Sequence, residues 1–309
     1  MEFFNIDGRL LETAKKAEEM ASEQFAKISE TAEYNGNKVL SAFINNRVSE
    51  MHLKGTIGYG YNDDGRDTLE QVYADVFHTE AALVRPQIMC GTHALNIALS
   101  ANLRPGDELL SPVGKPYDTM DEIIGIRPSK GSLAEYGVTY SQVDLLPDGD
   151  FDYEGIKNAI NERTKLVTIQ RSKGYASRPT LSVARIGELI AFIKNIRPDI
   201  ICMVDNCYGE FVERIEPSEV GADMIVGSLI KIRRRLAPCG ATSPVQKNVW
   251  SRRLTVYPHR GLERSRCNTR CQPVLLSGII PCADRCCRCF KGCDFCCKCL
   301  RKVRLQGHS

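Results

Sequence analysis

The sequence has no apolar run that approaches the ~18–20 residues of a membrane-spanning helix, so we predict no integral membrane protein and no membrane partner. Its first residues, "MEFFNIDGRLLETAKKAEEM", lack the apolar centre of a secretory signal peptide, which predicts a cytoplasmic location. The hydrophobic fraction of 43% and charged fraction of 26% are typical of a globular chain. A length of 309 residues suffices for one large or two modest domains.

Acidic residues are scarce in the C-terminal part of the chain, and cysteine is scarce in the rest of it. Residues 231–309 hold 18 Lys and Arg but 3 Asp and Glu, a net charge of +15, whereas residues 1–230 carry −12. Cysteine is rare in the first part, and ten of the 14 cysteines lie between Cys267 and Cys299. We therefore divide the chain into three predicted regions. These are an N-terminal helical segment (1–54), a large domain (55–231) and a basic, cysteine-rich tail (232–309) that we predict to be disordered.

Hydrophobic periodicity predicts an α/β fold. Apolar residues recur at helical spacing over 9–31 and 38–52, which predicts two amphipathic helices, and a loop rich in Gly, Asn and Asp follows over 55–67. Short apolar strands then alternate with helices, which is typical of a largely parallel sheet covered on both faces. The predicted strands cover 81–90, 107–113, 138–144, 165–170, 199–205 and 222–231. The predicted helices cover 68–77, 92–103 (with Thr92 as its cap), 117–125, 153–162 and 182–196.

Polar residues at three predicted strand ends suggest a site. In open α/β sheets, ligands bind at the carboxyl ends of the strands. Gly91, Thr92 and His93 stand where a strand gives way to a helix, and a glycine and a hydroxyl there suit a phosphate. A plain strand–helix turn is the alternative reading of these residues.

The other two strand ends carry Asp205 and the pair Ser228 and Lys231. Taken alone, Asp205 is better explained as a helix cap than as a metal ligand, and Lys231 could simply be solvated. Their order along the chain, after the Gly-Thr turn, is what pyridoxal phosphate requires. That cofactor needs an anion cradle, a carboxylate for the pyridine nitrogen and a lysine for the Schiff base.

Several long stretches resemble a known family over residues ~1–231. They include "GYGYNDDGRDTLEQVYADVF", "LRPGDELLSPVGKPYDTMDEIIGI", "IQRSKGYASRP" and "VDNCYGEFVERIEPSEVGADMIVGSLIK". The sequence here is similar to the aluminium-resistance or methionine γ-lyase-like family of fold-type I pyridoxal-phosphate enzymes. The resemblance implies a fold-type I large domain, pyridoxal 5'-phosphate as cofactor, and β- or γ-elimination on a small sulfur amino acid. It further implies a homodimer or homotetramer, no nucleic-acid partner and no metal site.

The resemblance also implies roles for individual residues. Lys231 would be the catalytic Schiff-base lysine and α-proton base, and Asp205 would bind the pyridine nitrogen. The residues that would hold the phosphate are Gly91, Thr92, His93 and Ser228. Tyr117 would stack on the ring, although an ordinary surface tyrosine is the alternative. A neighbouring subunit's site would be completed by Tyr59, Tyr61 and Arg66. The oxygen side of the cofactor could be lined by Gln170, Arg171 and Ser172.

The tail departs from the family pattern directly after Lys231. The family continues with Asn-Pro, a glycine run and a C-terminal small domain, whereas here Arg233, Arg234 and Arg235 follow. Cysteine codons read from their second base encode alanine or valine, and suitable arginine codons can yield glycine. Reread in this way, residues 265–299 match a segment of the family. We therefore favour a reading-frame error, which leaves the C-terminal domain missing or scrambled and the activity of the chain in doubt.

Two other readings of the tail stay open. "CCRCFKGCDFCCKC" has C-x-C and C-x-x-C spacings that suit zinc or copper(I), which would make the chain a metal-binding protein. The tail could instead be a basic arm. A non-catalytic protein that keeps the fold is a further alternative to a lyase.

Overall fold

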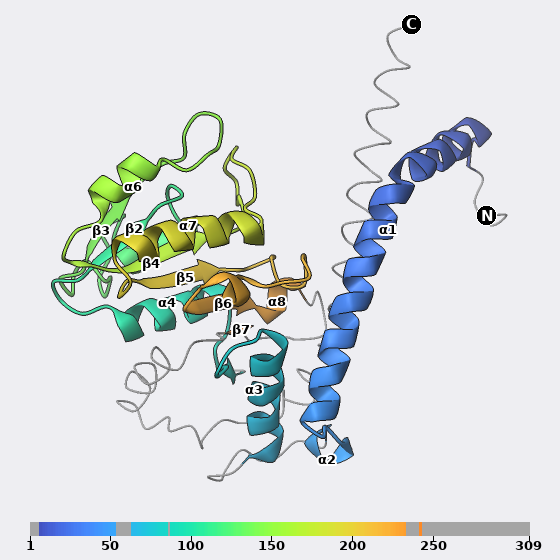
Figure 1. Ribbon diagram of the computed structural model, residues 1–309, viewed down its shortest axis with the longest axis horizontal. Coiled ribbons are helices and arrows are strands. Elements are labelled where there is room, and N and C mark those ends of the chain that lie inside the picture. Colours follow the sequence, from blue (N-terminus) through green and yellow to red (C-terminus); the bar gives the residue numbers. More distant parts are fainter. Residues whose placement is uncertain (1–5, 54–62, 86, 233–240, 243–309) are drawn as a thin grey trace, which may run out of the picture.

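The computed structural model describes residues 6–53, 63–85, 87–232 and 241–242, and Figure 1 shows their arrangement. At its centre lies a seven-stranded sheet in the order β1-β7-β6-β5-β4-β2-β3. Its strands are β1 (Val84–Arg85), β2 (Glu108–Ser111), β3 (Thr139–Gln142), β4 (Thr164–Gln170), β5 (Ile201–Asp205), β6 (Met224–Ser228) and β7 (Ala241–Thr242). The pairings from β6 to β3 are parallel, and β7 is antiparallel to β6 and β1. The predicted α/β class with a mostly parallel sheet is confirmed.

Helices cover both faces of this sheet, with α7 and α6 on one side and α4 on the other (Figure 1). The helices are α1 (Gly8–Asn45), α2 (Glu50–Leu53), α3 (Asp64–Val76), α4 (Gly91–Asn102), α5 (Asp121–Ile124), α6 (Tyr153–Ala159), α7 (Val183–Ile196) and α8 (Leu229–Ile232). Two 3₁₀ turns, η1 (Asp118–Met120) and η2 (Pro217–Val220), complete them.

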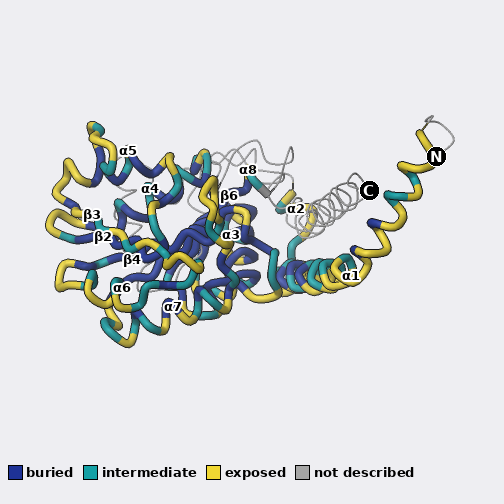
Figure 2. Tube along the Cα trace, turned by 90° about the horizontal axis from the view of Figure 1, so that it is seen from above, coloured by how far each residue is buried: buried dark blue, intermediate teal, exposed yellow. Residues whose placement is uncertain are grey.

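The central strand β5 shows how the sequence builds these layers. Successive side chains of a strand point to opposite faces. Ile201 and Met203 accordingly join the cluster beneath α4, whereas Cys202 and Val204 join the cluster beneath α7. Every residue of β5 is buried, as a parallel strand between two helical layers must be. The central strands β5 and β6 are buried throughout, whereas much of α1 is exposed (Figure 2).

The N-terminal segment differs from the prediction of two helices. α1 is one continuous helix of 38 residues, and the predicted second helix over 38–52 is absorbed into it, leaving only the short α2. The buried amide of Asn35, at the expected break, donates to the carbonyls of Phe211 (3.1 Å) and Glu213 (3.0 Å). This anchor to the domain holds the helix across Gly36. The helix ends where Arg47 adopts a left-handed conformation at φ 49°.

Other boundaries also shifted. The predicted strand over 81–90 is reduced to the two residues of β1. The predicted loop over 55–67 ends earlier, because the Asp63 side chain accepts the Arg66 N–H at 3.1 Å and starts α3 at Asp64. The sheet itself continues past Lys231, because β7 lies within the region predicted to be the tail. The tail's cysteine cluster between Cys267 and Cys299 lies outside the described residues.

The described residues contain neither a candidate membrane-spanning helix nor a candidate metal-binding cluster. None of the helices in 6–53, 63–85 and 87–232 is long and apolar enough to cross a membrane. The same part of the chain holds no group of three or more His, Cys, Asp or Glu side chains placed to bind a metal ion.

Candidate functional site

A cavity of about 330 Å³ opens at the carboxyl ends of β4, β5 and β6. This is the place where open α/β sheets bind ligands, because several strand ends and helix N-termini meet there. Its walls combine aromatic rings, hydroxyls, one buried carboxylate and lysines. The lining residues are Thr92, Leu95, Tyr117, Thr119, Ser172, Lys173, Gly174, Tyr175, Thr180, Asp205, Cys207, Tyr208 and Lys231.

Lys231 enters this cavity from α8, which follows β6 directly. Its Nζ lies 4.6 Å from the centroid of the Tyr208 ring and 5.5 Å from that of Tyr117. Both distances lie within the ~6 Å at which an ammonium group is attracted to an aromatic face. The two rings therefore hold the amine inside the cavity.

Asp205 lies at the end of β5 and is only 8% exposed. Burial raises the pKa of its carboxyl group, while hydrogen bonds from Cys207 and the positive charge of Lys231 act in the opposite direction. The Cys207 N–H donates to Asp205 Oδ1 at 3.0 Å. A buried carboxylate that faces a cavity gains most from a cationic ligand group, such as a protonated pyridine nitrogen.

The N-terminus of α4 forms another wall of the cavity. The predicted threonine cap is wrong, because the helix begins at Gly91 and its cap residue, Cys90, makes no side-chain cap bond. The Thr92 hydroxyl instead lies 2.9 Å from the Thr119 hydroxyl. The first N–H groups of a helix have no intrahelical acceptor, so this end offers donors and a positive dipole to an anion.

Gly91 is required by close packing at this helix end. A Cβ atom there would lie 2.9 Å from Cys207 Sγ and 3.2 Å from Ser228 Cβ. Ser228 is buried at the end of β6, and its N–H donates to Glu210 Oε1 at 3.0 Å. Gly91 thus lets α4, β5 and β6 meet in one place.

His93 is engaged by the turn that precedes its helix. Its Nδ1 accepts the Met89 N–H at 3.3 Å, so one ring nitrogen serves the local backbone. Tyr117 stacks on Tyr175, with ring centroids 5.8 Å apart. A hydrogen bond with Tyr175 is the main cause that raises the pKa of the Tyr117 hydroxyl.

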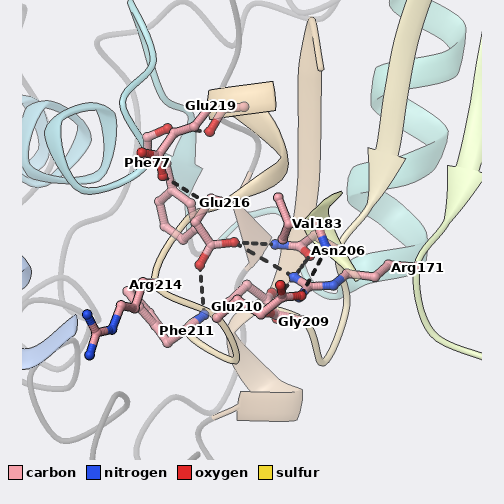
Figure 3. A network of polar contacts seen from close by, with 12 residues as sticks. Phe77, Arg171, Val183, Asn206, Gly209, Glu210, Phe211, Arg214, Glu216 and Glu219 are labelled. Atoms are coloured by element: carbon pink, nitrogen blue, oxygen red, sulfur yellow. Dashed lines mark hydrogen bonds and ion pairs between the residues drawn. The ribbon is translucent and has the colours of Figure 1, made fainter. Parts of the chain in front are cut away.

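The structure directs Arg171 away from the cavity. Its guanidinium donates to Asn206 Oδ1 (2.8 Å), the Gly209 carbonyl (2.8 Å) and Glu213 Oε1 (2.6 Å), as Figure 3 shows. Arg171 therefore secures the loop after β5. Its neighbours behave differently, because Ser172 lines the cavity and the Gln170 amide donates to the Ser172 carbonyl at 2.9 Å.

Of the predicted neighbouring-subunit residues, Arg66 is described by the structure, and it does not line this cavity. Tyr59 and Tyr61 lie outside the described residues. Arg66 is buried on α3, where its Nε donates to Asp67 Oδ1 at 3.1 Å. Its Nη1 has no hydrogen-bond partner within the described part of the chain.

Sequence analysis missed several residues of the cavity, among them two with aromatic rings and one with a thiol. Cys207 and Tyr208 lie two and three residues after Asp205, and Tyr175 belongs to the stretch "IQRSKGYASRP" that resembles the family. Tyr208 adopts a left-handed conformation at φ 72°, which is rare for an aromatic residue. Their place in the sequence, next to a predicted site residue, was the available signal.

The chemistry of these residues fits pyridoxal phosphate. The cavity brings together a buried carboxylate, a lysine amine and an aromatic ring. It also lies against the N-terminus of α4, where the close approach of Cys207 and Ser228 leaves no room for a side chain on residue 91. These match, in turn, the cofactor's ring nitrogen, aldehyde, ring face and phosphate. The four parts come from different elements and meet only in the folded chain.

Comparison with known proteins identifies the family. The methionine gamma-lyase family model matches residues 10–306. The uncharacterised protein YnbB of Bacillus subtilis is 52% identical over 227 residues, which cover 72% of this chain and 54% of YnbB. The chain thus spans about half the length of that curated relative.

Two solved structures are similar to most of the chain. One is a candidate cystathionine beta-lyase involved in aluminium resistance from Listeria monocytogenes, with a TM-score of 0.91 and 44% identity, covering 95% of this chain and 73% of that one. The other is a carbon-sulfur lyase involved in aluminium resistance from Clostridium novyi NT, with a TM-score of 0.89 and 40% identity, covering 97% and 72%. The chain belongs to the methionine gamma-lyase family.

Proposed function

We propose that the protein binds pyridoxal 5'-phosphate in the cavity at β4–β6 and cleaves a carbon–sulfur bond of a small amino acid by β- or γ-elimination. The observation that carries this proposal is the meeting of Asp205, Lys231 and the N-terminus of α4 around one cavity. Family membership supports the same reaction class.

The residues of the cavity would hold the cofactor at four points. Lys231 would bind it covalently through Nζ, and Asp205 would pair with the pyridine nitrogen. The N-terminus of α4 at Gly91 would hold the phosphate, and Tyr117 would lie against the ring. When bound, the cofactor supplies an electron sink for negative charge at the substrate α-carbon.

Lys231 would also move the proton. Its amine, once released by the incoming substrate amine, is the base in the cavity that can accept the α-proton. The Tyr117 and Tyr208 rings, which flank Nζ, would keep this amine over the site. The resulting ammonium group would then donate this proton to the leaving sulfur, so that a thiol departs as the carbon–sulfur bond breaks.

Cofactor binding is the first test. The purified full chain is mixed with pyridoxal phosphate, reduced with borohydride, digested and examined by mass spectrometry. A pyridoxyl group on the peptide that contains Lys231, absent in K231A, is the expected result. A chain that gains no visible absorbance and no modified Lys231 contradicts the proposal.

The reaction is tested separately by thiol and 2-oxo acid release from cystathionine, cysteine and methionine. Pyruvate from cystathionine or cysteine indicates β-elimination, whereas 2-oxobutyrate from cystathionine or methionine indicates γ-elimination. A chain that binds the cofactor and releases neither product is a non-catalytic member of the family.

We further propose a homodimer or homotetramer in which Tyr59, Tyr61 and Arg66 reach a neighbouring subunit's cavity. Membership of the methionine gamma-lyase family is what supports this proposal, since Arg66 itself is 1% exposed in the single chain. Sedimentation of the full chain, with and without cofactor, tests it.

A further inference from the structure

We propose that Thr119 is a positioning residue for the cofactor's phosphate, in which its hydroxyl donates to the Thr92 hydroxyl and leaves the proton of Thr92 for the phosphate. This inference rests on the proposed function, because that function places the phosphate at the N-terminus of α4. It concerns a residue of the cavity to which the proposed function gives no role.

The two hydroxyls meet at one wall of the cavity. Thr92 Oγ1 and Thr119 Oγ1 lie 2.9 Å apart, and both residues line the cavity that contains Asp205 and Lys231. Within the described residues, neither hydroxyl has a second hydrogen-bond partner. Each hydroxyl carries one proton, and the pair uses one of these two protons for its shared hydrogen bond. One O–H donor is therefore left over at this wall.

The surroundings of Thr92 favour an anion over a neutral group. Thr92 is the second residue of α4, which begins at Gly91. The Ala94 N–H donates to the Cys90 carbonyl at 3.0 Å, whereas the N–H groups before it have no acceptor in the helix. These donors and the helix dipole attract negative charge to the place where the Thr92 hydroxyl lies. The proton of Thr92 is thus the one that a phosphate would meet, and Thr119 supplies the hydrogen bond that Thr92 accepts.

A short turn fixes the position of Thr119. It is the middle residue of the 3₁₀ turn η1, in which the Met120 N–H donates to the Tyr117 carbonyl at 2.8 Å. Met120 is 3% exposed and belongs to the same apolar cluster as Leu95 of α4. Packing of the Met120 side chain therefore holds η1 against α4, with the Thr119 hydroxyl beside Thr92.

The phosphate end of the proposed site can be measured separately from the ring end. Tyr117, Asp205 and Lys231 would hold the ring and the aldehyde of the cofactor. Pyridoxal has the same ring and aldehyde but no phosphate, so its binding should not depend on the two threonine hydroxyls. The ratio of the affinities for pyridoxal phosphate and for pyridoxal therefore reports on the phosphate end alone.

The experiment is a double-mutant cycle on the full chain, with T92V, T119V and the variant that carries both substitutions. Valine keeps the branched shape of threonine and removes its hydroxyl, whereas T119S keeps the hydroxyl. Each protein is titrated with pyridoxal phosphate and, separately, with pyridoxal, followed by visible absorbance. Urea unfolding is measured without either compound. T139V is the matched control, because Thr139 is an exposed threonine at the amino end of β3, away from the strand ends that border the cavity.

We expect T119V to weaken the binding of pyridoxal phosphate about three- to tenfold, with pyridoxal binding within about twofold of the unsubstituted chain. T92V should weaken the binding of pyridoxal phosphate at least as much. T119V should add little once the Thr92 hydroxyl is removed, because Thr119 acts through that hydroxyl. T119S and T139V should bind both compounds like the unsubstituted chain.

Three results overturn this inference while the proposed function stands. They are unchanged binding by T119V, equal weakening of both compounds by T119V, and full additivity of T92V and T119V. Equal weakening would mean that Thr119 maintains the shape of the turn, and full additivity would mean that the two hydroxyls act independently. An unsubstituted chain in which neither compound modifies Lys231 overturns the proposed function and this inference together.

Discussion

Two buried carboxylates lie at opposite ends of the segment that follows β5. Glu216 is completely enclosed, and its two oxygens accept the Phe211 N–H (2.8 Å) and the Asn206 amide (3.0 Å), with Arg171 at 4.0 Å (Figure 3). Asp205, at 8% exposure, accepts one hydrogen bond within the described part of the chain, from the Cys207 N–H at 3.0 Å. Burial raises the pKa of both groups.

The comparison separates a carboxylate that the protein itself pairs from one that it leaves open to the cavity. The protein itself supplies the partners of Glu216, so this side chain organises the loop that carries Cys207 and Tyr208. Asp205 faces a cavity that also contains a lysine, so its remaining acceptor positions are open to water or to a ligand. Buried charge that the protein leaves incompletely paired is a mark of a functional site.

The largest expected effect is on Lys231, the cation that faces Asp205. We expect K231A to lower lyase activity on the order of 10²–10⁴-fold, because it removes the base that moves the α-proton. The measurement is the rate of 2-oxo acid release by the full chain at saturating cofactor. K157A, which changes an exposed lysine of α6, is the control. Loss of activity in both variants would point to general damage.

The second prediction concerns stability and contrasts the two carboxylates directly. E216A should lower the free energy of unfolding by about 3–5 kcal/mol, because it leaves buried donors and the Arg171 charge without an acceptor. D205A should cost about 1 kcal/mol or less in the cofactor-free chain, because its cavity admits water. Urea unfolding without cofactor measures both values. Equal losses would contradict the distinction between the two carboxylates.

The third prediction uses pH to isolate Asp205. Because burial raises its pKa above 3.8, the folded state binds this proton at a higher pH than the unfolded state does. The free energy of unfolding therefore falls as pH rises through the window between the two pKa values. D205N lacks this loss, so it should gain stability relative to the unsubstituted chain as pH rises above 3.8.

Urea unfolding of both proteins at several values from roughly pH 4 to pH 8 measures this difference. The contribution of Glu216 is common to both proteins and cancels. A constant difference across the series would show that the carboxyl group of Asp205 has the same pKa in the folded and unfolded states.

The smallest effect is expected at the exposed rim of the cavity. Tyr175 is 87% exposed and stacks on Tyr117. Y175A should weaken cofactor binding by about 1 kcal/mol or less, the usual contribution of one aromatic pair, while the free energy of unfolding stays nearly unchanged. Y175F keeps the ring and should behave like the unsubstituted chain. A tenfold loss in Y175F would mean that the hydroxyl, rather than stacking, matters.

Much of the fold could be predicted because its signals are local. The strands around 165–170, 199–205 and 222–228 are continuous apolar runs, and helix α7 has a clear helical period, so each was located within a few residues. Asp205 and Lys231 could be singled out for the same reason, since each follows one of these strands. Their assigned roles stay predictions until the cofactor is tested.

Other features had no local signal. Whether the chain breaks near Gly36 depended on a contact between Asn35 and the carbonyls of Phe211 and Glu213. Thr92 has the composition of a cap, yet the tight meeting of α4 with β5 and β6 placed the helix start at Gly91. We predicted that Arg171 lies beside the cofactor together with Gln170 and Ser172. Because side chains alternate in direction along the chain, Arg171 instead bonds to Asn206 and Glu213.

By itself, the sequence determined the alternation of strands and helices. That alternation also determined the edge of the sheet at which Asp205, Ser228 and Lys231 lie. Apolar periodicity suffices for this, because it acts within a few residues of chain. Only the tertiary structure decided that Glu216 is satisfied while Asp205 is not, and that Cys207 and Tyr208 face the same cavity as Lys231. Burial and pairing depend on residues far apart in the sequence, and no local pattern records which of them meet.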